Sequence, residues 1–576
     1  MNLLFLVFIG ILLLLCGYFI YGFFLSRALR LRSDFKTPAH EFRDNADFMP
    51  IGKFYLLGQH LSAIAAAGPI VGPILAGLWF GWLPTILWVI FGGILVGGVH
   101  DMTALVASVR YQGRSIAEVI KENMSRRAFI LFLLFLWFSL IYIITAFCDI
   151  TASTFADEVN GSAVASSSMM YLGLALAMGV VLRKFKLSVS VATVIFLPLV
   201  FLCIYLGPRL PLGLPPLFGM DLRMTWDVIL LTYCFIAAVI PVWLLLQPRG
   251  YLGGFFLSFT AGLSFIGLVI GSFTQRFLIQ YPAFRGWVSP QGFPLFPLLF
   301  TTVACGACSG FHAIVASGTT SKQLSKETDA KLIGYGGMLF ESFVAIVALS
   351  TLLLLTAGQA QKLQDPNQIF ANGIAVFLGT LGVNRQFAFN FALLAFATFV
   401  YDTLDVATRL GRYVFGELTN WRGRFSSYAA TLATLLLPFA FVSRKIIDAQ
   451  GNIVSVWKIF WTVFGSSNQL LAALVLLGIS VWLFKNQMRY RFVLWPCIFM
   501  LVVAMLSLYL VLEPWLLEVL VKRRLILAPL GITGFVLLIL AFMLIFEVVA
   551  IFFSSSSSLR GVPTKSGRRS NPYDVG

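Results

Sequence analysis

Charged side chains are scarce in this sequence. Asp, Glu, Lys and Arg make up 11% of its 576 residues, whereas an average soluble domain has about 25%. Hydrophobic residues account for 59% of the chain, and the mean hydropathy is +0.90. Because so few charges cannot solvate the surface of a soluble protein of this length, the composition predicts an all-α polytopic membrane protein.

Acidic residues are rarer than basic ones, which leaves a formal net charge of +17. In a soluble protein, this excess would indicate a nucleic-acid partner. Here the basic residues fall in short loops between apolar runs, so we interpret them as topology signals and expect no nucleic-acid partner.

Several motifs of enzymes and pumps are missing. No G-x-x-x-x-G-K-[S/T] phosphate loop occurs, which argues against ATP-driven transport by this chain alone. No zinc signature occurs, and no G-x-S-x-G motif lies in a soluble strand–helix context. The seven cysteines lie mostly in apolar segments and indicate no disulfide framework. Cys305 and Cys308 have metal or redox spacing, but no second Cys/His pair accompanies them. We therefore interpret both as small helix residues and expect no metal and no cofactor.

Long apolar runs dominate what is present. A window of about 19 residues predicts fifteen membrane spans. They are residues 2–26, 60–80, 84–109, 128–148, 168–182, 187–206, 226–247, 251–273, 296–318, 334–358, 386–405, 426–442, 459–484, 492–512 and 525–552.

The distribution of basic residues predicts the orientation of the chain. If the N-terminus is outside, the inward loops contain 29 of the 41 Lys and Arg residues, Arg249 among them. Because inward loops collect Lys and Arg, we expect the N-terminus outside and the C-terminus in the cytoplasm. No cleavage site follows residues 2–26, so we interpret that span as an uncleaved anchor.

One span carries an unusual number of helix breakers. Gly68, Pro69, Gly72 and Pro73 follow Ala65 in the middle of an apolar run. Proline donates no backbone hydrogen bond, so the break frees carbonyl groups that hydrocarbon cannot satisfy. Broken helices of this kind bind substrates and ions in transporters, so we assign these residues to a binding site. The alternative is a kink that only shapes packing, with the two glycines as a small-xxx-small contact.

A second proline predicts a second break. Pro241 falls within the span 226–247 and frees the carbonyl group of Ala237. Prolines in corresponding helices of two inverted halves point to a binding site between them. We therefore expect a five-plus-five core. Its segments are a transmembrane helix (1–26), a cytoplasmic linker (27–59), a first repeat (60–206), an inverted second repeat (226–405), four additional C-terminal helices (426–552) and a disordered cytoplasmic tail (553–576).

The span 296–318 and its end are the most polar part of the predicted core. Ser309, Ser317, Thr319 and Thr320 offer oxygen atoms to a small cation or a carboxylate, although such side chains also bond their own i−4 carbonyl groups. His312 lies in the same span, and an ionisable group there is a candidate for function. The alternative is a neutral imidazole satisfied by helix carbonyls.

Further ionisable residues near the inner ends of spans are candidates for coupling or gating. They are His60, His100, Asp101, Glu341, Asp402, Asp405 and Arg409. His60 can also be a solvated end residue, and Asp101 can serve a proton relay or a structural bond to an arginine. Asp405 and Arg409 are four residues apart on one helical face and can pair. Asn468 and Gln469 add polar groups that can link helices.

Several of these motifs together resemble a known family. His60–Pro73, Pro241–Tyr251, Cys305–Gln323, Leu404–Arg412 and Trp461–Ala473 are similar to the carbon starvation protein A (CstA) family of bacterial membrane transporters. The resemblance covers about residues 50–480. It implies uptake of pyruvate or peptides across the inner membrane, proton symport in some members, and a LeuT-like core. His100 replaces an expected glutamine, and Cys308 is unusual in its motif.

The sequence therefore favours a secondary transporter that imports a small organic nutrient with a coupling ion (H⁺ or Na⁺) by alternating access. One alternative is a membrane-embedded nutrient sensor that binds the same ligand without turnover. Another is an intramembrane enzyme, which needs a convergent His/Asp/Cys constellation that the spacing does not assemble. We accordingly expect no enzymatic activity.

Overall fold

The chain is almost entirely helical. The computed structural model describes residues 2–44, 48–65, 67–185, 187–217, 219–363, 365–421, 425–444, 446–447, 453–522 and 528–559. The predicted disordered tail therefore lies mostly outside the described residues. Its first part does not match the prediction, because helix α23 continues to Leu559.

The helices fall into two groups along the chain. The first comprises α1 (Leu3–Cys16), α2 (Gly22–Ala28), α3 (Pro38–Glu41), α4 (Lys53–Ile64), α5 (Gly68–Phe80), α6 (Trp82–Gly92), α7 (Gly98–Arg110), α8 (Ile116–Asn123), α9 (Arg126–Phe155), α10 (Gly161–Lys184), α11 (Val189–Leu206), α12 (Leu222–Val239) and α13 (Leu246–Thr274).

The second comprises α14 (Leu295–Val303), α15 (Gly310–Gly318), α16 (Gly336–Leu353), α17 (Ala357–Leu363), α18 (Pro366–Gly379), α19 (Arg385–Thr419), α20 (Ser426–Val442), α21 (Val456–Lys485), α22 (Arg491–Lys522) and α23 (Ala528–Leu559). A short antiparallel hairpin of β1 (Ile446–Ile447) and β2 (Ile453–Val454) precedes α21.

Twelve helical segments of the described chain are long and apolar enough to cross a membrane, and a bent pair brings this to thirteen. Two shorter apolar helices, Ser426–Val442 and Gly534–Glu547, lie where the sequence predicts two further spans. The all-α polytopic fold is thereby confirmed, while the count of fifteen spans stays a prediction.

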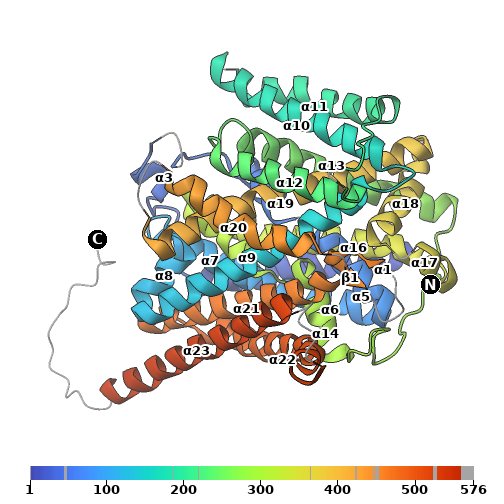
Figure 1. Cartoon of the computed structure of the whole chain (residues 1–576). Coiled ribbons are helices and arrows are strands. Elements are labelled where there is room, and N and C mark those ends of the chain that lie inside the picture. The colour runs from blue at the N-terminus through green and yellow to red at the C-terminus, as the bar shows by residue number, and fades with distance from the viewer. Residues whose placement is uncertain are drawn as a thin grey trace.

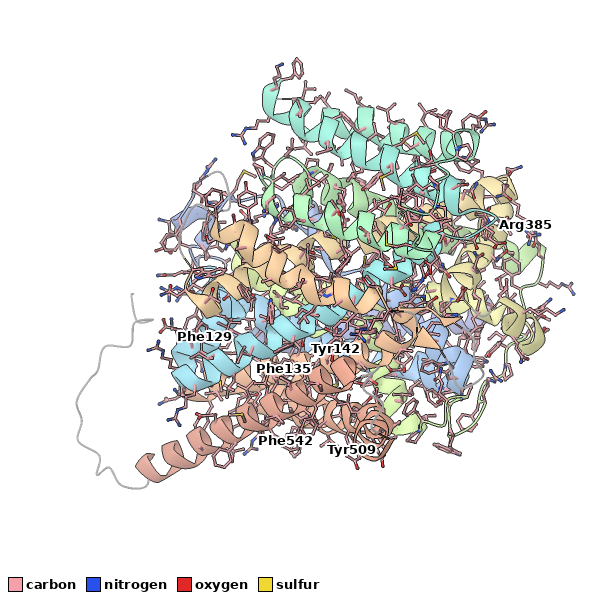
Figure 2. All side chains as sticks on the ribbon, in the orientation of Figure 1. Phe129, Phe135, Tyr142, Arg385, Tyr509 and Phe542 are labelled. Carbon is pink, nitrogen blue, oxygen red and sulfur yellow. The ribbon has the colours of Figure 1, made fainter. Side chains whose placement is uncertain are left out.

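Three long helices form the centre of the bundle. α9 packs against α19 and α21, and all three have mostly buried faces. α10 and α11 form a pair on one side of the molecule, and α22 and α23 lie on the other (Figure 1). Outer helices expose apolar side chains such as Tyr509 and Phe542, whereas Phe135 and Tyr142 of α9 are buried (Figure 2). An apolar exterior of this kind suits contact with lipid.

The predicted break after Ala65 is present. α4 and α5 meet at an angle of 49° across a break of three residues, of which Ala66 lies outside the described part. Pro69 falls in the first turn of α5, where a missing N–H group costs nothing because that group has no helical partner. α4 begins at Lys53, so this helix starts earlier than the span predicted from residue 60.

The second break lies elsewhere than predicted. α12 ends at Val239 and α13 begins at Leu246, and each helix is long enough to be a span of its own. Pro241 therefore lies in the connection between two helices, and the prediction of a mid-span break there is wrong. The segment Leu295–Lys322 is broken instead: helical geometry stops between α14 and α15, where Ala304 has a φ of 44°. Gly306 and Gly310 flank this break, and the proline of α14, Pro297, lies two turns before it.

The two broken segments lie against each other. A Cβ atom added at Gly72 would fall 2.7 Å from the carbonyl oxygen of Thr302 and within contact of that of Val303. Only glycine lets the start of α5 approach the end of α14 so closely. This close approach matches the packing alternative for the two glycines.

The loop predicted for residues 149–167 is shorter than expected. α9 runs to Phe155 and α10 starts at Gly161, so Asp149 is a buried helix residue. Asp149 pairs with Arg223 at the start of α12 and accepts a hydrogen bond from the backbone N–H of Trp457 (2.7 Å) at the start of α21. These contacts tie one end of the bundle together.

Candidate functional site

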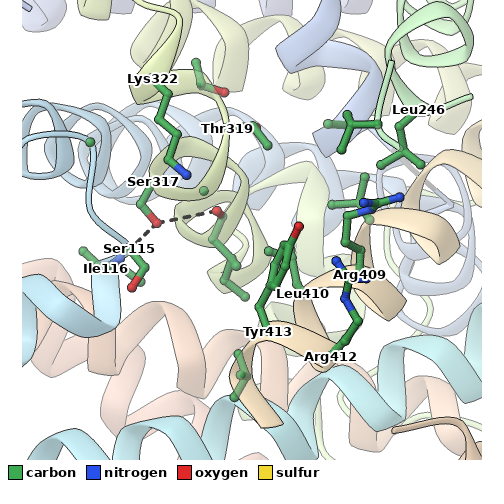
Figure 3. A pocket seen from close by; sticks show the side chains of 18 of the residues that line it. Ser115, Ile116, Leu246, Ser317, Thr319, Lys322, Arg409, Leu410, Arg412 and Tyr413 are labelled. Carbon is green, nitrogen blue, oxygen red and sulfur yellow. Dashed lines mark hydrogen bonds between the residues drawn. The ribbon is translucent and has the colours of Figure 1, made fainter. Parts of the chain in front are cut away.

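A cavity of about 950 Å³ opens at the other end of the bundle. α4, the segment that leads into α8, the start of α13, the end of α15 and the second half of α19 surround it. Figure 3 shows Leu246, Lys322, Arg409, Arg412 and Tyr413 around this space.

Basic side chains predominate among the charged residues that line the cavity. Arg114, Lys322, Arg409 and Arg412 lie in its wall, and Arg249 lies deeper. The acidic lining residues are Glu118, Asp402 and Glu417. Since Asp402 is paired with Arg249 (2.5 Å), the open part of the cavity has an excess of positive charge.

A buried ion network lies at the inner end of the cavity. Arg249 donates from Nε to Asp402 (2.5 Å) and lies 2.5 Å from Asp405 through Nη1. Tyr233 donates to Asp405 (2.7 Å), and Ser62 donates to Asp402 (2.5 Å). We call these five residues the Arg249 network. It joins α4, α12, α13 and α19, and Ser62, Arg249 and Asp402 also line the cavity.

The predicted pairing of Asp405 with Arg409 is wrong. Arg409 instead donates from Nη2 to the carbonyl oxygens of Ala237 (2.7 Å) and Ile240 (2.6 Å), where α12 ends. The sequence correctly indicates a freed carbonyl at Ala237, but a guanidinium group satisfies it. Neither Ala237 nor Pro241 is among the cavity residues.

Three of the four predicted hydroxyl residues line the cavity. Thr319 bonds the carbonyl group of Val315, its i−4 neighbour, as the alternative interpretation expects. Ser317 bonds that of Ala313 and also accepts from the backbone N–H of Ile116 (3.0 Å; Figure 3). Thr320 lies 2.9 Å from Nδ1 of His60.

His60 is not a solvated end residue. Its exposed fraction is 1%, although it borders the cavity. Its Nε2 atom has no hydrogen-bond partner among the described residues.

A second charged cluster lies beyond the cavity wall. Nδ1 of His312 on α15 is 2.8 Å from Asp101 on α7, and Nε2 is 3.1 Å from Glu341 on α16. The other carboxylate oxygen of Asp101 is 2.7 Å from Nδ1 of His100. We call these four residues the His312 cluster. All four are fully buried, so three helices meet through charged groups inside the protein.

The partners of Asp101 are histidines rather than an arginine. Of the two alternatives for Asp101, the structural bond to an arginine is therefore absent among the described residues.

The polar residues around the second break are linked to α21. Asn468 donates to Ser309 (3.0 Å) and accepts from the backbone N–H of Phe311 (3.1 Å), while Gln469 donates to the carbonyl group of Cys308 (2.8 Å). The prediction that Asn468 and Gln469 link helices is confirmed.

The residues of the first break are buried away from the cavity. Ala65, Gly68, Pro69, Gly72 and Pro73 are buried, and none of them borders the cavity. The cavity reaches only Gln59–Ala63 on the α4 side of that break. Ser309 and His312 are likewise outside its wall.

Sequence reasoning missed Arg249, Tyr233 and Ser62. It counted Arg249 as a loop residue between two spans, whereas the side chain is 2% exposed. Arg249 is in fact the fourth residue of α13. The available signal for a buried pair was an arginine directly beside a predicted span, with two acidic residues in a later span.

The chain matches the family model "Carbon starvation protein CstA" over residues 2–370 and 358–507. It is 32% identical to the "Peptide transporter CstA" of Campylobacter jejuni subsp. jejuni over 572 residues, which cover 87% of this chain and 79% of that protein. It is 31% identical to the "Peptide transporter CstA" of Bacillus subtilis, with coverage of 86% and 87%.

It is also 31% identical to the "Pyruvate/proton symporter BtsT" of Escherichia coli, with coverage of 83% and 77%. Among solved structures, the complex of MhsT with L-phenylalanine matches 80% of this chain and 98% of its own, at 11% identity and a TM-score of 0.49.

Proposed function

The chain belongs to the carbon starvation protein CstA family, and we propose that it is a secondary active transporter that imports a small organic nutrient by alternating access. The relatives are named as transporters of peptides or of pyruvate with protons, which supports a pyruvate-like carboxylate or a short peptide as substrate. The observation that carries the proposal is a cavity of about 950 Å³ that ends on a buried ion network shared with the bent α4.

The positive cavity supports an anionic or zwitterionic substrate. Lys322, Arg409 and Arg412 offer donors to a carboxylate from two sides. Ser317, Thr319 and Thr320 add hydroxyl groups to the same wall.

The cavity opens at one end of the bundle, whereas ion-pair and hydrogen-bond contacts hold helices together at the other end, an arrangement that suits one state of an alternating-access cycle. Leu133 and Leu136 of α9 border the cavity, whereas Asp149 binds α12 and α21 about 20 Å further along the same helix. Because basic residues surround the open end, we assign it to the cytoplasm of a bacterial inner membrane, with the N-terminus outside.

We assign proton coupling to the Arg249 network. Two carboxylates share one guanidinium group there, and Asp402 borders the cavity. One oxygen of Asp405 has no hydrogen-bond partner in the described part of the chain. A proton on this network would neutralise its excess negative charge and would loosen the link from Asp402 to Ser62 on α4. A membrane potential of 100 mV supplies about 2.3 kcal/mol per proton, enough for roughly 50-fold accumulation.

We revise the proposed repeats so that each half begins with its broken segment. The first half then comprises α4–α5, α6–α7, α9, α12 and α13, with α10 and α11 as an insertion. The second comprises α14–α15, α16, α19, α20 and α21. The contact of Gly72 with the end of α14 supports this pairing.

Reconstitution of the purified chain into proton-tight liposomes tests the proposal. We expect uptake of labelled pyruvate or a short peptide when a pH gradient is imposed, and no stimulation by a Na⁺ gradient. Saturable binding of these ligands without flux would instead support the sensor alternative.

A further inference from the structure

The sulfur atom of a cysteine lies beside the His312 cluster. Sγ of Cys305, a nitrogen of His312 and a carboxylate oxygen of Glu341 all lie within 4.8 Å of one another, and all three residues are buried. They come from three segments, namely the break after α14, helix α15 and helix α16. Sulfur, imidazole and carboxylate are the ligand types of Zn²⁺ and related transition metals.

Asp101 fixes the orientation of the His312 ring through Nδ1, the nitrogen that faces away from Glu341. Asp101 lies 2.8 Å from Nδ1, which directs Nε2 towards Glu341. His100 holds the other oxygen of Asp101 (2.7 Å). A carboxylate on the far nitrogen of a histidine is the arrangement that orients metal-binding histidines.

The atoms that face the proposed ion contact little besides one another. Nε2 of His312 lies 3.1 Å from a carboxylate oxygen of Glu341, and neither residue makes a regular hydrogen bond through these atoms with any other described residue outside the group; both side chains are 0% exposed. A buried carboxylate is expensive unless a cation compensates it, and the cation here is either a protonated His312 or an added metal ion.

The sulfur of Cys305 lies against the N-terminal turn of a helix. A Cβ atom added at Gly68, the first residue of the 13-residue helix α5, would lie 2.5 Å from Sγ. Nδ2 of Asn468 lies 3.7 Å from the same sulfur, and the hydroxyl oxygen of Ser309 lies 3.4 Å from it.

His60 lies between the cavity and this group of residues. It borders the cavity, and its Cδ2 atom lies 3.3 Å from the position of a Cβ atom at Gly337 on α16. Glu341 follows Gly337 by one turn of the same helix. Nε2 of His60, which has no hydrogen-bond partner among the described residues, is thus placed between the cavity wall and α16.

We propose that Cys305, His312 and Glu341 bind a single divalent transition-metal ion of the Zn²⁺ class, with Asp101 as the positioning residue for His312. Binding releases the thiol proton of Cys305, and the ion joins the break after α14 to α15 and α16. This site is distinct from the Arg249 network, so metal binding can be measured without any transport assay.

The experiment uses the full-length protein in detergent after removal of metals with a chelator. Titration with Co²⁺ should saturate at one ion per chain and produce a thiolate-to-cobalt charge-transfer band, which Zn²⁺ should then abolish. Cys305→Ser should lose the band. Cys308→Ser is the matched control, because Cys308 is a buried cysteine of the same segment that lies outside the ligand group, and it should keep the band. Asp101→Asn should keep the band but weaken affinity by about 10- to 100-fold.

Loss of the band in Cys308→Ser to the same extent as in Cys305→Ser would overturn the proposal, as would an unchanged band in Cys305→Ser. X-ray absorption of cobalt bound to the unmodified protein provides a measurement that no folding defect of a variant affects. It should detect one sulfur neighbour together with nitrogen and oxygen. A cobalt ion surrounded by oxygen alone would also refute the site.

Discussion

The Arg249 network and the His312 cluster both bury several charged side chains inside a membrane protein, yet they are built differently. Arg249 is a permanent cation that contacts two carboxylates at 2.5 Å, and the network touches the cavity. The His312 cluster contains no lysine or arginine, and it lies wholly behind the cavity wall. A permanent internal cation makes a network independent of bound metal ions. A cluster without one needs either a proton on histidine or an added cation.

Removal of the permanent cation should give the largest effect. Arg249→Met leaves Asp402 and Asp405 buried without their partner, so we expect a loss of about 3–5 kcal/mol of stability and no uptake. Denaturant unfolding in detergent measures the first and liposome uptake the second. Arg412→Met, which changes a cavity arginine that is only half-buried, is the control and should unfold near the wild-type midpoint. Equal stability of the two variants would contradict the role of Arg249 as the cation that compensates Asp402 and Asp405.

Added metal should affect only the His312 cluster. At a free Zn²⁺ concentration of about 100 times Kd, we expect a stabilisation of about 2.7 kcal/mol. Thermal unfolding with and without Zn²⁺ measures this shift. Cys305→Ser should not respond to Zn²⁺, whereas Cys308→Ser should respond as the wild type does. A response in Cys305→Ser would place the bound metal elsewhere.

A single methyl group tests how tightly the Arg249 network is packed. In Gly253→Ala, the new Cβ atom would fall 2.5 Å from Asp402 and 2.7 Å from Ser62. We expect a loss of about 1–3 kcal/mol. Gly250→Ala on the same helix meets nothing within 4 Å, so its unfolding midpoint should not fall. If the two variants lose the same stability, helix propensity rather than the network explains the result.

Thr319→Ala should have the smallest effect. Its hydroxyl group bonds only its own helix among the contacts described, so we expect a change within about 0.5 kcal/mol in the free energy of unfolding. A destabilisation comparable to that of Gly253→Ala would show that Thr319 belongs to a larger polar network.

Local chemistry allowed much of the fold to be predicted. Pro69 and Gly68 identify the break after Ala65 because proline and glycine act through the backbone near their own positions. The second break was misplaced because no proline lies next to Ala304, and packing against α5 helps to hold its geometry. Pro241 carries a strong local signal but lies between two helices.

The candidate site was predicted less well. The sequence indicated Asp101, His312, Glu341, Asp402 and Asp405 as costly residues in apolar segments. It did not indicate their partners. Asp405 has an arginine four residues away, but its ion pair forms with Arg249 on another helix.

By itself, the sequence determined that this chain enters a membrane, that it is helical, where one helix breaks and which side chains are too polar for lipid. These properties depend on single residues and their immediate neighbours. Only the tertiary structure decided where the second break lies, which charges pair and which residues face the cavity. Charge pairing depends on distances between helices that are remote in sequence, such as the contact of Arg249 with Asp402, and no local pattern encodes such distances.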